Sequence, residues 1–154
     1  VGFEILDSVE STNEAQKKSL LAKIQKILGE DLNGKKIALW GLAFKPETDD
    51  VRESPALTII KQLEDRDVKL VAYDPIAGDN AKKILPNLNI VSDMYECLKD
   101  AECLVITTAW KQFKEADLEK VKSYLKSPNI VDGRNLFDQK KMKDLGFNYV
   151  SVGR

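Results

Sequence analysis

From Lys35 onward, short apolar runs alternate with segments of helical pattern, and this alternation is the feature that most limits what the chain can fold into. The runs are rich in Val, Ile and Leu and show no regular polar alternation. Such runs are typical of strands buried on both faces of a parallel sheet. We expect strands over residues 36–40, 69–73, 89–91, 103–107, 129–131 and 149–152.

Helical patterns fill the gaps between these runs. They cover residues 55–66, 77–84, 94–99, 114–124 and 140–145. Regular strand–helix alternation predicts an α/β fold, here a Rossmann-like, doubly wound parallel sheet of about six strands. In the usual strand order, 3-2-1-4-5-6, the loops that follow strands one, four and five converge at one edge of the sheet.

Another helix is expected before the first strand. Ser11 and Glu14 fit a capping box, an apolar stripe follows, and Gly29 or Gly34 is expected to end the helix. A helix in this place belongs to no strand–helix–strand unit, so its stripe must pack on the domain or on a part outside this chain. We expect residues 1–34 to be the end of a neighbouring domain with its linker, and residues 35–154 to form the α/β domain. The stripe consists of Leu20, Leu21, Ile24, Ile27 and Leu28.

Length and composition limit the function further. The 154 residues suffice for one domain with a short appendage. A formal net charge of −1 gives no general attraction to nucleic acid or to an anionic membrane. The sequence has no apolar run of about 18 residues and no signal-peptide pattern, so we expect no membrane span and a cytoplasmic location.

Few residues suited to catalysis are present. The chain has no histidine, which is the commonest general base. Cys97 and Cys103 are its only cysteines, and too few ligands accompany them to complete a metal site. We expect both to be buried thiols, and we expect no catalysis by this chain alone.

The segment from Gly41 to Ala56 is a long charged loop between the first strand and the first helix of the sheet domain. Ser54 followed by proline is typical of a helix N-cap. The loop therefore follows a strand's carboxyl end, where open α/β sheets bind ligands. The glycine fingerprint of dinucleotide binding is absent, but Lys45 and Arg134 could hold a phosphate through their side chains.

Each candidate residue also has a commoner interpretation. Lys45 alone is more often a solvated loop lysine, Arg52 beside acidic neighbours could be a surface ion pair, and Arg134 could be a turn residue. Asp74 stands where a ribose-binding carboxylate would follow the second strand, although Asp-Pro is also a routine turn start, which we favour. Trp110 is more often a core residue than a platform for a ligand.

Four stretches in a fixed order are more specific than any single residue. They read GLAFKPETDDVRESPA at 41–56, VAYDP at 71–75, VITTAWKQFKEADLEKV at 105–121 and IVDGRNLFD at 130–138. Together they closely resemble the carboxyl-terminal domain of the UDP-glucose/GDP-mannose dehydrogenase family. The resemblance covers Lys35 to the end, and Asn13-Glu-Ala-Gln16 is similar to a motif on the last helix of that family's central domain.

The resemblance implies a role within a larger enzyme. In the family, an amino-terminal Rossmann domain binds NAD, a central helical domain supports dimerisation, and the carboxyl-terminal domain binds the nucleotide of the sugar nucleotide. The enzyme oxidises the sugar's C6 alcohol to a carboxylate in two NAD-dependent steps through a cysteine thioester. The glycine-rich motif around that cysteine and the NAD fingerprint do not occur here. The implied partners are therefore UDP-glucose or another UDP-sugar and the missing domains, in a homodimer or larger assembly.

The resemblance also assigns roles to individual residues. Phe44 and Lys45 match the family's substrate-contacting Phe-Lys pair, and Arg134 matches an arginine that also meets the substrate. Arg52 matches an arginine that reaches across the interdomain cleft toward NAD. No catalytic residue and no metal ligand is implied. Two alternatives stay open: the same domain of a GDP-mannose or UDP-N-acetylhexosamine dehydrogenase, and a structural or assembly module that binds no nucleotide.

Overall fold

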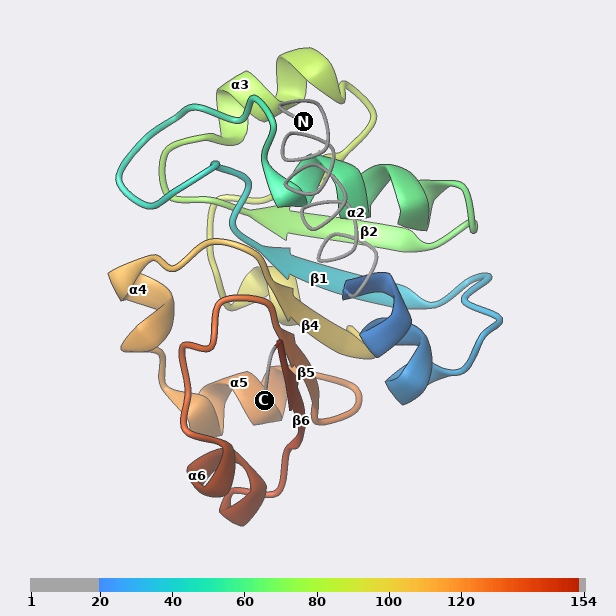
Figure 1. Cartoon of the computed structure of the whole chain (residues 1–154), viewed down its shortest axis with the longest axis vertical. Helices are drawn as coiled ribbons and strands as arrows, with labels where there is room; N and C mark the ends of the chain where they lie inside the picture. Colours follow the sequence, from blue (N-terminus) through green and yellow to red (C-terminus); the bar gives the residue numbers. More distant parts are fainter. Residues whose placement is uncertain (1–19, 153–154) are drawn as a thin grey trace, which may run out of the picture.

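The computed structural model describes residues 20–152, which form one six-stranded sheet with helices on both faces (Figure 1). All five neighbouring strand pairs are parallel, and the order is β3-β2-β1-β4-β5-β6. The predicted fold class and strand order are both confirmed. The strands are β1 (Lys36–Trp40), β2 (Lys69–Tyr73), β3 (Asn89–Ile90), β4 (Cys103–Ile106), β5 (Asn129–Asp132) and β6 (Asn148–Ser151).

Helices connect the strands, as parallel pairing requires. The first of them, α2, has Ser54 as its N-cap, with the hydroxyl accepting a hydrogen bond from the Ala56 amide, and Pro55 in the first turn as predicted. The helical segments are α2 (Pro55–Glu64), α3 (Gly78–Ile84), the single 3-10 turn η1 (Glu96–Leu98), α4 (Lys111–Lys114), α5 (Leu118–Tyr124) and α6 (Gln139–Asp144).

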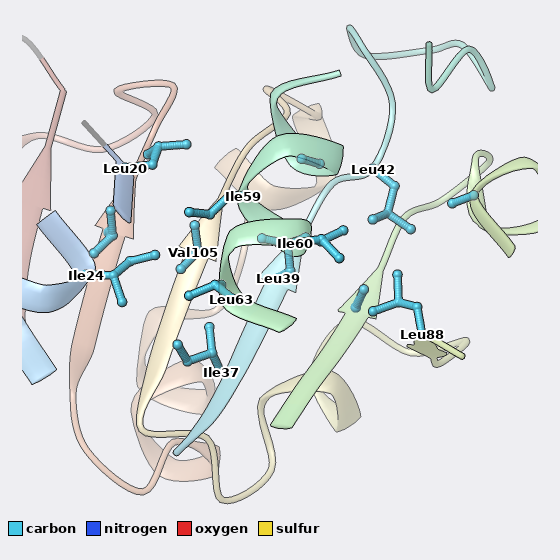
Figure 2. Close-up of a cluster of buried hydrophobic side chains, with 14 of the residues drawn as sticks. Leu20, Ile24, Ile37, Leu39, Leu42, Ile59, Ile60, Leu63, Leu88 and Val105 are labelled. Atoms are coloured by element: carbon cyan, nitrogen blue, oxygen red, sulfur yellow. The ribbon is translucent and has the colours of Figure 1, made fainter. Parts of the chain in front are cut away.

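The sheet separates two hydrophobic clusters. Because side chains of a strand alternate between faces, Ile37 and Leu39 of β1 belong to one cluster, and Ala38 and Trp40 belong to the other. Figure 2 shows the first cluster, where residues of α2 meet those of β1 and β4. In the second cluster the rings of Trp40 and Phe113 stack with centroids 4.9 Å apart. Both faces of β1 and β4 are covered, which explains the continuous apolar sequence at residues 37–40 and 103–106.

Residues 20–28 form a helix that packs on the first cluster. Leu20 and Ile24 are buried there, and Leu21, Ile27 and Leu28 are partly buried against the same cluster. The predicted stripe is thus confirmed, and it packs on this domain. Gly29 ends the helix with φ +96°, and its amide donates to the carbonyl of Gln25 at 2.8 Å. Ser11, Glu14 and the 13–16 motif lie outside the described residues.

Two of the predicted helices are wrong in form. The helix expected over residues 94–99 is only the 3-10 turn η1, whose start is held by Asp93 accepting from the amides of Tyr95 and Glu96. Of the helix expected over residues 114–124, only residues 118–124 form a helix, α5, while Lys114 is the last residue of the preceding α4 and residues 115–117 are not helical. The start of α5 is fixed by Asp117, because its side chain caps the helix by accepting from the Lys120 amide at 3.2 Å.

Candidate functional site

The carboxyl ends of the strands meet at one edge of the sheet, and the arrows of the labelled strands point to it in Figure 1. Strands β1 and β4 are neighbours there, while their helical connections lead to opposite sides of the sheet. Open α/β sheets bind ligands at this switch point. The loop between β1 and α2 extends from the same edge, and it carries Phe44, Lys45 and Arg52.

The loop after β1 begins at Gly41, which has φ +103°. A Cβ atom at this position would lie 2.4 Å from Oγ1 of Thr108 and 2.8 Å from its backbone nitrogen. Only glycine allows both this backbone conformation and this close approach to the loop after β4. The first residue of the 41–56 segment is therefore fixed by its contact with a neighbouring strand's loop.

Two threonines after β4 hold the same loop. The Thr107 hydroxyl donates to the carbonyl of Gly41 at 2.6 Å, and the Thr108 hydroxyl donates to the carbonyl of Ala43 at 2.9 Å. Both threonines are buried. These hydrogen bonds join the loops on the two sides of the switch point into one unit.

Asp74, directly after β2, is a third point of attachment. Its Oδ2 accepts hydrogen bonds from the amides of Leu42 and Ala43 at 2.7 and 3.1 Å, and from Nε1 of Trp110 at 3.3 Å. Its Oδ1 accepts from the amides of Ile76 and Ala77 at 2.9 and 2.8 Å. Both carboxylate oxygens thus organise the edge of the sheet, in agreement with the structural interpretation favoured from the sequence.

Farther along the loop, Phe44 and Arg52 line an open hollow of about 340 Å³ together with Asp50 and Glu53. Phe44 is 48% exposed, and its amide donates to the carbonyl of Asp50 at 2.7 Å. Arg52 forms a two-pronged ion pair with Asp50, with N–O distances of 3.1 and 3.2 Å. Hydrogen bonds from Arg52 lower the pKa of Asp50, and those with Asp50 raise the pKa of Arg52.

Arg134 lies on the turn after β5, at the same edge of the sheet. The buried carboxylate of Asp132 holds this turn by accepting from the amides of Arg134, Leu136 and Phe137 and from the Tyr149 hydroxyl. Gly133 cannot carry a side chain without meeting the Ile106 carbonyl, because a Cβ atom there would lie 2.8 Å from that oxygen. The Arg134 side chain itself is exposed at the edge of the sheet.

The four residues expected to contact ligands therefore occupy two loops of one edge. Phe44 and Arg52 share the hollow, whereas Lys45 and Arg134 are exposed and do not line it. Trp110 is only 7% exposed, and its indole N–H donates a hydrogen bond to Asp74, so it is a core residue.

The two thiols are buried, as predicted. Burial raises the pKa of both Cys97 and Cys103 to about 12, so neither is a thiolate near neutral pH. Within residues 20–152, no group of three or more His, Cys, Asp or Glu side chains could hold a metal ion. No helix in the same stretch is long and apolar enough to cross a membrane.

Sequence reasoning missed how the loops are held. The threonines at 107 and 108, the carboxylate of Asp132 and the long-range bonds of Asp74 were not recognised as supports of the site. One signal was available: in a parallel sheet, polar residues that end adjacent strands lie side by side. Asp74 ends β2 and the loop from Gly41 ends β1, and the two strands are hydrogen-bonded neighbours.

The fold and this edge define a doubly wound α/β domain of the kind that binds nucleotides. A family model described as "UDP-glucose/GDP-mannose dehydrogenase family, UDP binding domain" matches residues 38–139. The chain belongs to the UDP-glucose/GDP-mannose dehydrogenase family and includes its UDP-binding domain.

Several curated relatives cover nearly the whole chain. It is 42% identical to a UDP-glucose 6-dehydrogenase of Rickettsia prowazekii in an alignment 155 positions long, which covers 99% of this chain and 36% of that protein. It is 41% identical to the UDP-glucose 6-dehydrogenase TuaD of Bacillus subtilis, over 99% of this chain and 33% of that protein. The chain thus spans about a third of the length of these relatives.

Solved structures agree with this assignment. A UDP-glucose dehydrogenase from Pyrobaculum islandicum superposes with a TM-score of 0.78 and 30% identity, over 94% of this chain and 31% of that one. A UDP-D-ManNAc dehydrogenase from Pyrococcus horikoshii superposes with a TM-score of 0.70 and 25% identity, over 91% of this chain and 30% of that one.

Proposed function

We propose that this chain is the nucleotide-sugar-binding domain of an NAD-dependent UDP-glucose 6-dehydrogenase, which converts UDP-glucose to UDP-glucuronate. The observation that carries the proposal is the match to the UDP-binding family model, which includes both loops of the ligand-binding edge. Domain boundaries follow the sequence prediction: residues 1–34 end a central domain and its linker, and residues 35–154 form the binding domain. Catalysis and assembly into a dimer or larger oligomer are assigned to the other domains of the enzyme.

In this proposal Phe44, Lys45 and Arg134 bind the UDP-sugar. Lys45 is a point charge and Arg134 a planar fork, and both can pair with phosphate. Both side chains are exposed at the edge. Phe44, which precedes Lys45 in sequence, offers a half-exposed ring suited to packing on an apolar or flat part of the ligand.

NAD, which the family resemblance implies, does not fit this domain in the usual manner of the fold. The pyrophosphate would need free backbone amides after the first strand, but those of Leu42 and Ala43 already donate to Asp74. We therefore assign NAD binding to another domain of the enzyme. Arg52 is proposed as the one contact from this chain toward NAD, in the complete enzyme.

The alternative of an assembly module without a ligand has less support. Its basis was the apolar stripe of the first helix, and Leu20 and Ile24 of that stripe pack on this domain's own cluster. The other alternative, the same domain of a GDP-mannose or UDP-N-acetylhexosamine dehydrogenase, stays open. The cytoplasmic location stays a prediction.

Isothermal titration of the 154-residue chain with UDP and with UDP-glucose tests the proposal. Lys45→Ala and Arg134→Ala are expected to weaken binding about tenfold each, because each removes a charge-assisted contact. Lys69→Ala is the matched control, because it removes the same charge from the amino end of β2, at the opposite edge. GDP-mannose and UDP-N-acetylglucosamine are titrated in parallel. Equal affinity in Arg134→Ala, Lys69→Ala and the unmodified chain would contradict the proposed site.

A further inference from the structure

The amides of Leu42 and Ala43 occupy a special place in this fold. They follow the first strand at the switch point, where backbone amides of doubly wound nucleotide-binding domains receive a ligand's phosphate. Here both amides already donate to an anion that belongs to the chain, the Oδ2 atom of Asp74, at 2.7 and 3.1 Å. The position that a phosphate would take is therefore occupied by the carboxylate of Asp74.

The surroundings of Asp74 have the composition of an anion site. Four backbone amides and one indole N–H converge on the carboxylate, all within 3.3 Å. The residue is only 7% exposed. Charge-assisted hydrogen bonds of this kind are shorter and stronger than neutral ones, and their strength grows where water is excluded.

A simple turn start explains only part of this arrangement. An aspartate that begins a turn accepts from amides two and three residues later, as Oδ1 does with Ile76 and Ala77. The partners of Oδ2 are different, because Leu42 lies 32 residues earlier and Trp110 lies 36 residues later. These bonds join loops of three strands, which no turn requires.

We propose that Asp74 is a built-in anion that fills the phosphate position after β1, and so directs ligand phosphates outward to the side chains of the same edge. It acts as a positioning residue. Ala43 is held at its amide by Asp74 and at its carbonyl by Thr108, so the residues that follow, Phe44 and Lys45, start from a fixed point. The filling of the position stands on geometry, whereas the effect on UDP rests on the proposed function.

Chemical rescue tests the built-in anion. Asp74→Ala removes the carboxylate and leaves five donors around a small space, so the melting temperature is expected to fall by about 10 °C. Sodium formate at about 0.5 M supplies a free carboxylate, and we expect it to restore about 3 °C or more of that loss relative to sodium chloride of equal strength. Asp117→Ala is the control, because it removes an exposed carboxylate that accepts one capping bond.

Two results would overturn the role. One is a formate effect of the same size on Asp74→Ala, Asp117→Ala and the unmodified chain. The other concerns Asp74→Asn, which keeps the shape but replaces one acceptor oxygen with a donor, so that one of the two sets of amides loses its partner. If amide exchange in Asp74→Asn stays as slow as in the unmodified chain at Leu42, Ala43, Ile76 and Ala77, the carboxylate does not hold these groups. This measurement also serves if Asp74→Ala does not fold.

UDP titration separates this inference from the proposed function. We expect Asp74→Ala to bind UDP about tenfold more weakly and formate to recover part of that loss. Rescue of melting temperature without UDP binding by the unmodified chain would overturn the proposed function and leave the built-in anion in place. Undiminished UDP affinity in Asp74→Ala, with UDP binding intact in the unmodified chain, would overturn the positioning of Phe44 and Lys45.

Discussion

Two buried carboxylates, Asp74 and Asp132, hold the loops that carry the proposed ligand-binding residues. Asp74 binds the start of the loop that leads to Phe44 and Lys45, and Asp132 binds the turn that carries Arg134. These exposed residues were proposed from sequence because they stand in motifs that resemble those of the family. The contacts that hold them were missed, because the partners of a buried carboxylate are decided by which loops the sheet brings together.

Gly41 gives a direct test of the close approach between β1 and β4. Gly41→Ala is expected to cost about 3 kcal/mol or more, since the new methyl group would collide with Thr108 in addition to the strain of positive φ. Gly34→Ala is the matched control: Gly34 also has positive φ, but nothing lies within 4 Å of the new atom, so about 1 kcal/mol is expected. Urea unfolding of both variants measures the difference, and equal losses would contradict the collision.

The buried thiols predict a pH dependence of stability. Their pKa is about 12 in the folded chain against an ordinary value of 9.0, so between these limits the unfolded chain has lost a proton that the folded chain keeps. The free energy of unfolding therefore falls as pH rises from about 9 to 12, by about 1.4 kcal/mol per pH unit for each thiol. Cys97→Ala is expected to reduce this slope by one thiol's share in urea unfolding at several pH values. An unchanged slope would contradict the prediction.

At the scale of elements, local sequence signals predicted the first residues of helices more accurately than the interruptions within them. Ser54 followed by Pro55 correctly marked the start of α2. Asp117, within the predicted helix over residues 114–124, was overlooked as the N-cap of α5, and α4 ends before it at Lys114. The periodicity of apolar residues continues across such a break, so it does not reveal the cap.

The two caps differ in burial, and this difference predicts different costs. Ser54→Ala removes the acceptor of the Ala56 amide at a buried helix start, and we expect a loss of about 2 kcal/mol. Asp117→Ala removes an exposed cap, where water can replace the lost acceptor, so about 1 kcal/mol is expected. Thermal or urea unfolding measures which of the two substitutions lowers stability more. Ser54→Thr, which keeps a hydroxyl, is a useful control. A greater loss for Asp117→Ala would refute the role of burial.

For the whole molecule, two clusters on opposite faces of one sheet account for the arrangement of helices. Regular alternation of strands and helices predicted this architecture well, because parallel neighbours need a crossover connection and both faces then become buried. The packing of the helix over residues 20–28 was left open, because the sequence of an apolar stripe does not show which surface it packs on.

The contribution of that helix can be measured. Ile24 is fully buried, and Ile24→Ala is expected to cost about 3 kcal/mol in urea unfolding. Ile27 is only partly buried on the same helix, so Ile27→Ala is expected to cost about 1 kcal/mol. If both substitutions leave the midpoint unchanged, the helix is not part of this domain's core, and the boundary proposed at residue 34 marks a real separation.

The sequence by itself determined the strands and most helix starts, because these follow from short-range patterns. Its regular alternation also predicted a doubly wound sheet with the usual strand order, and the ligand-contacting residues stay a prediction. Only the tertiary structure decided what supports that site. Leu42, Asp74 and Trp110 are separated by more than 30 residues along the chain, yet one carboxylate joins them. Parallel pairing places the ends of β1, β2 and β4 side by side. A buried carboxylate must be hydrogen-bonded, so it accepts from the donors that the neighbouring strand ends bring near it.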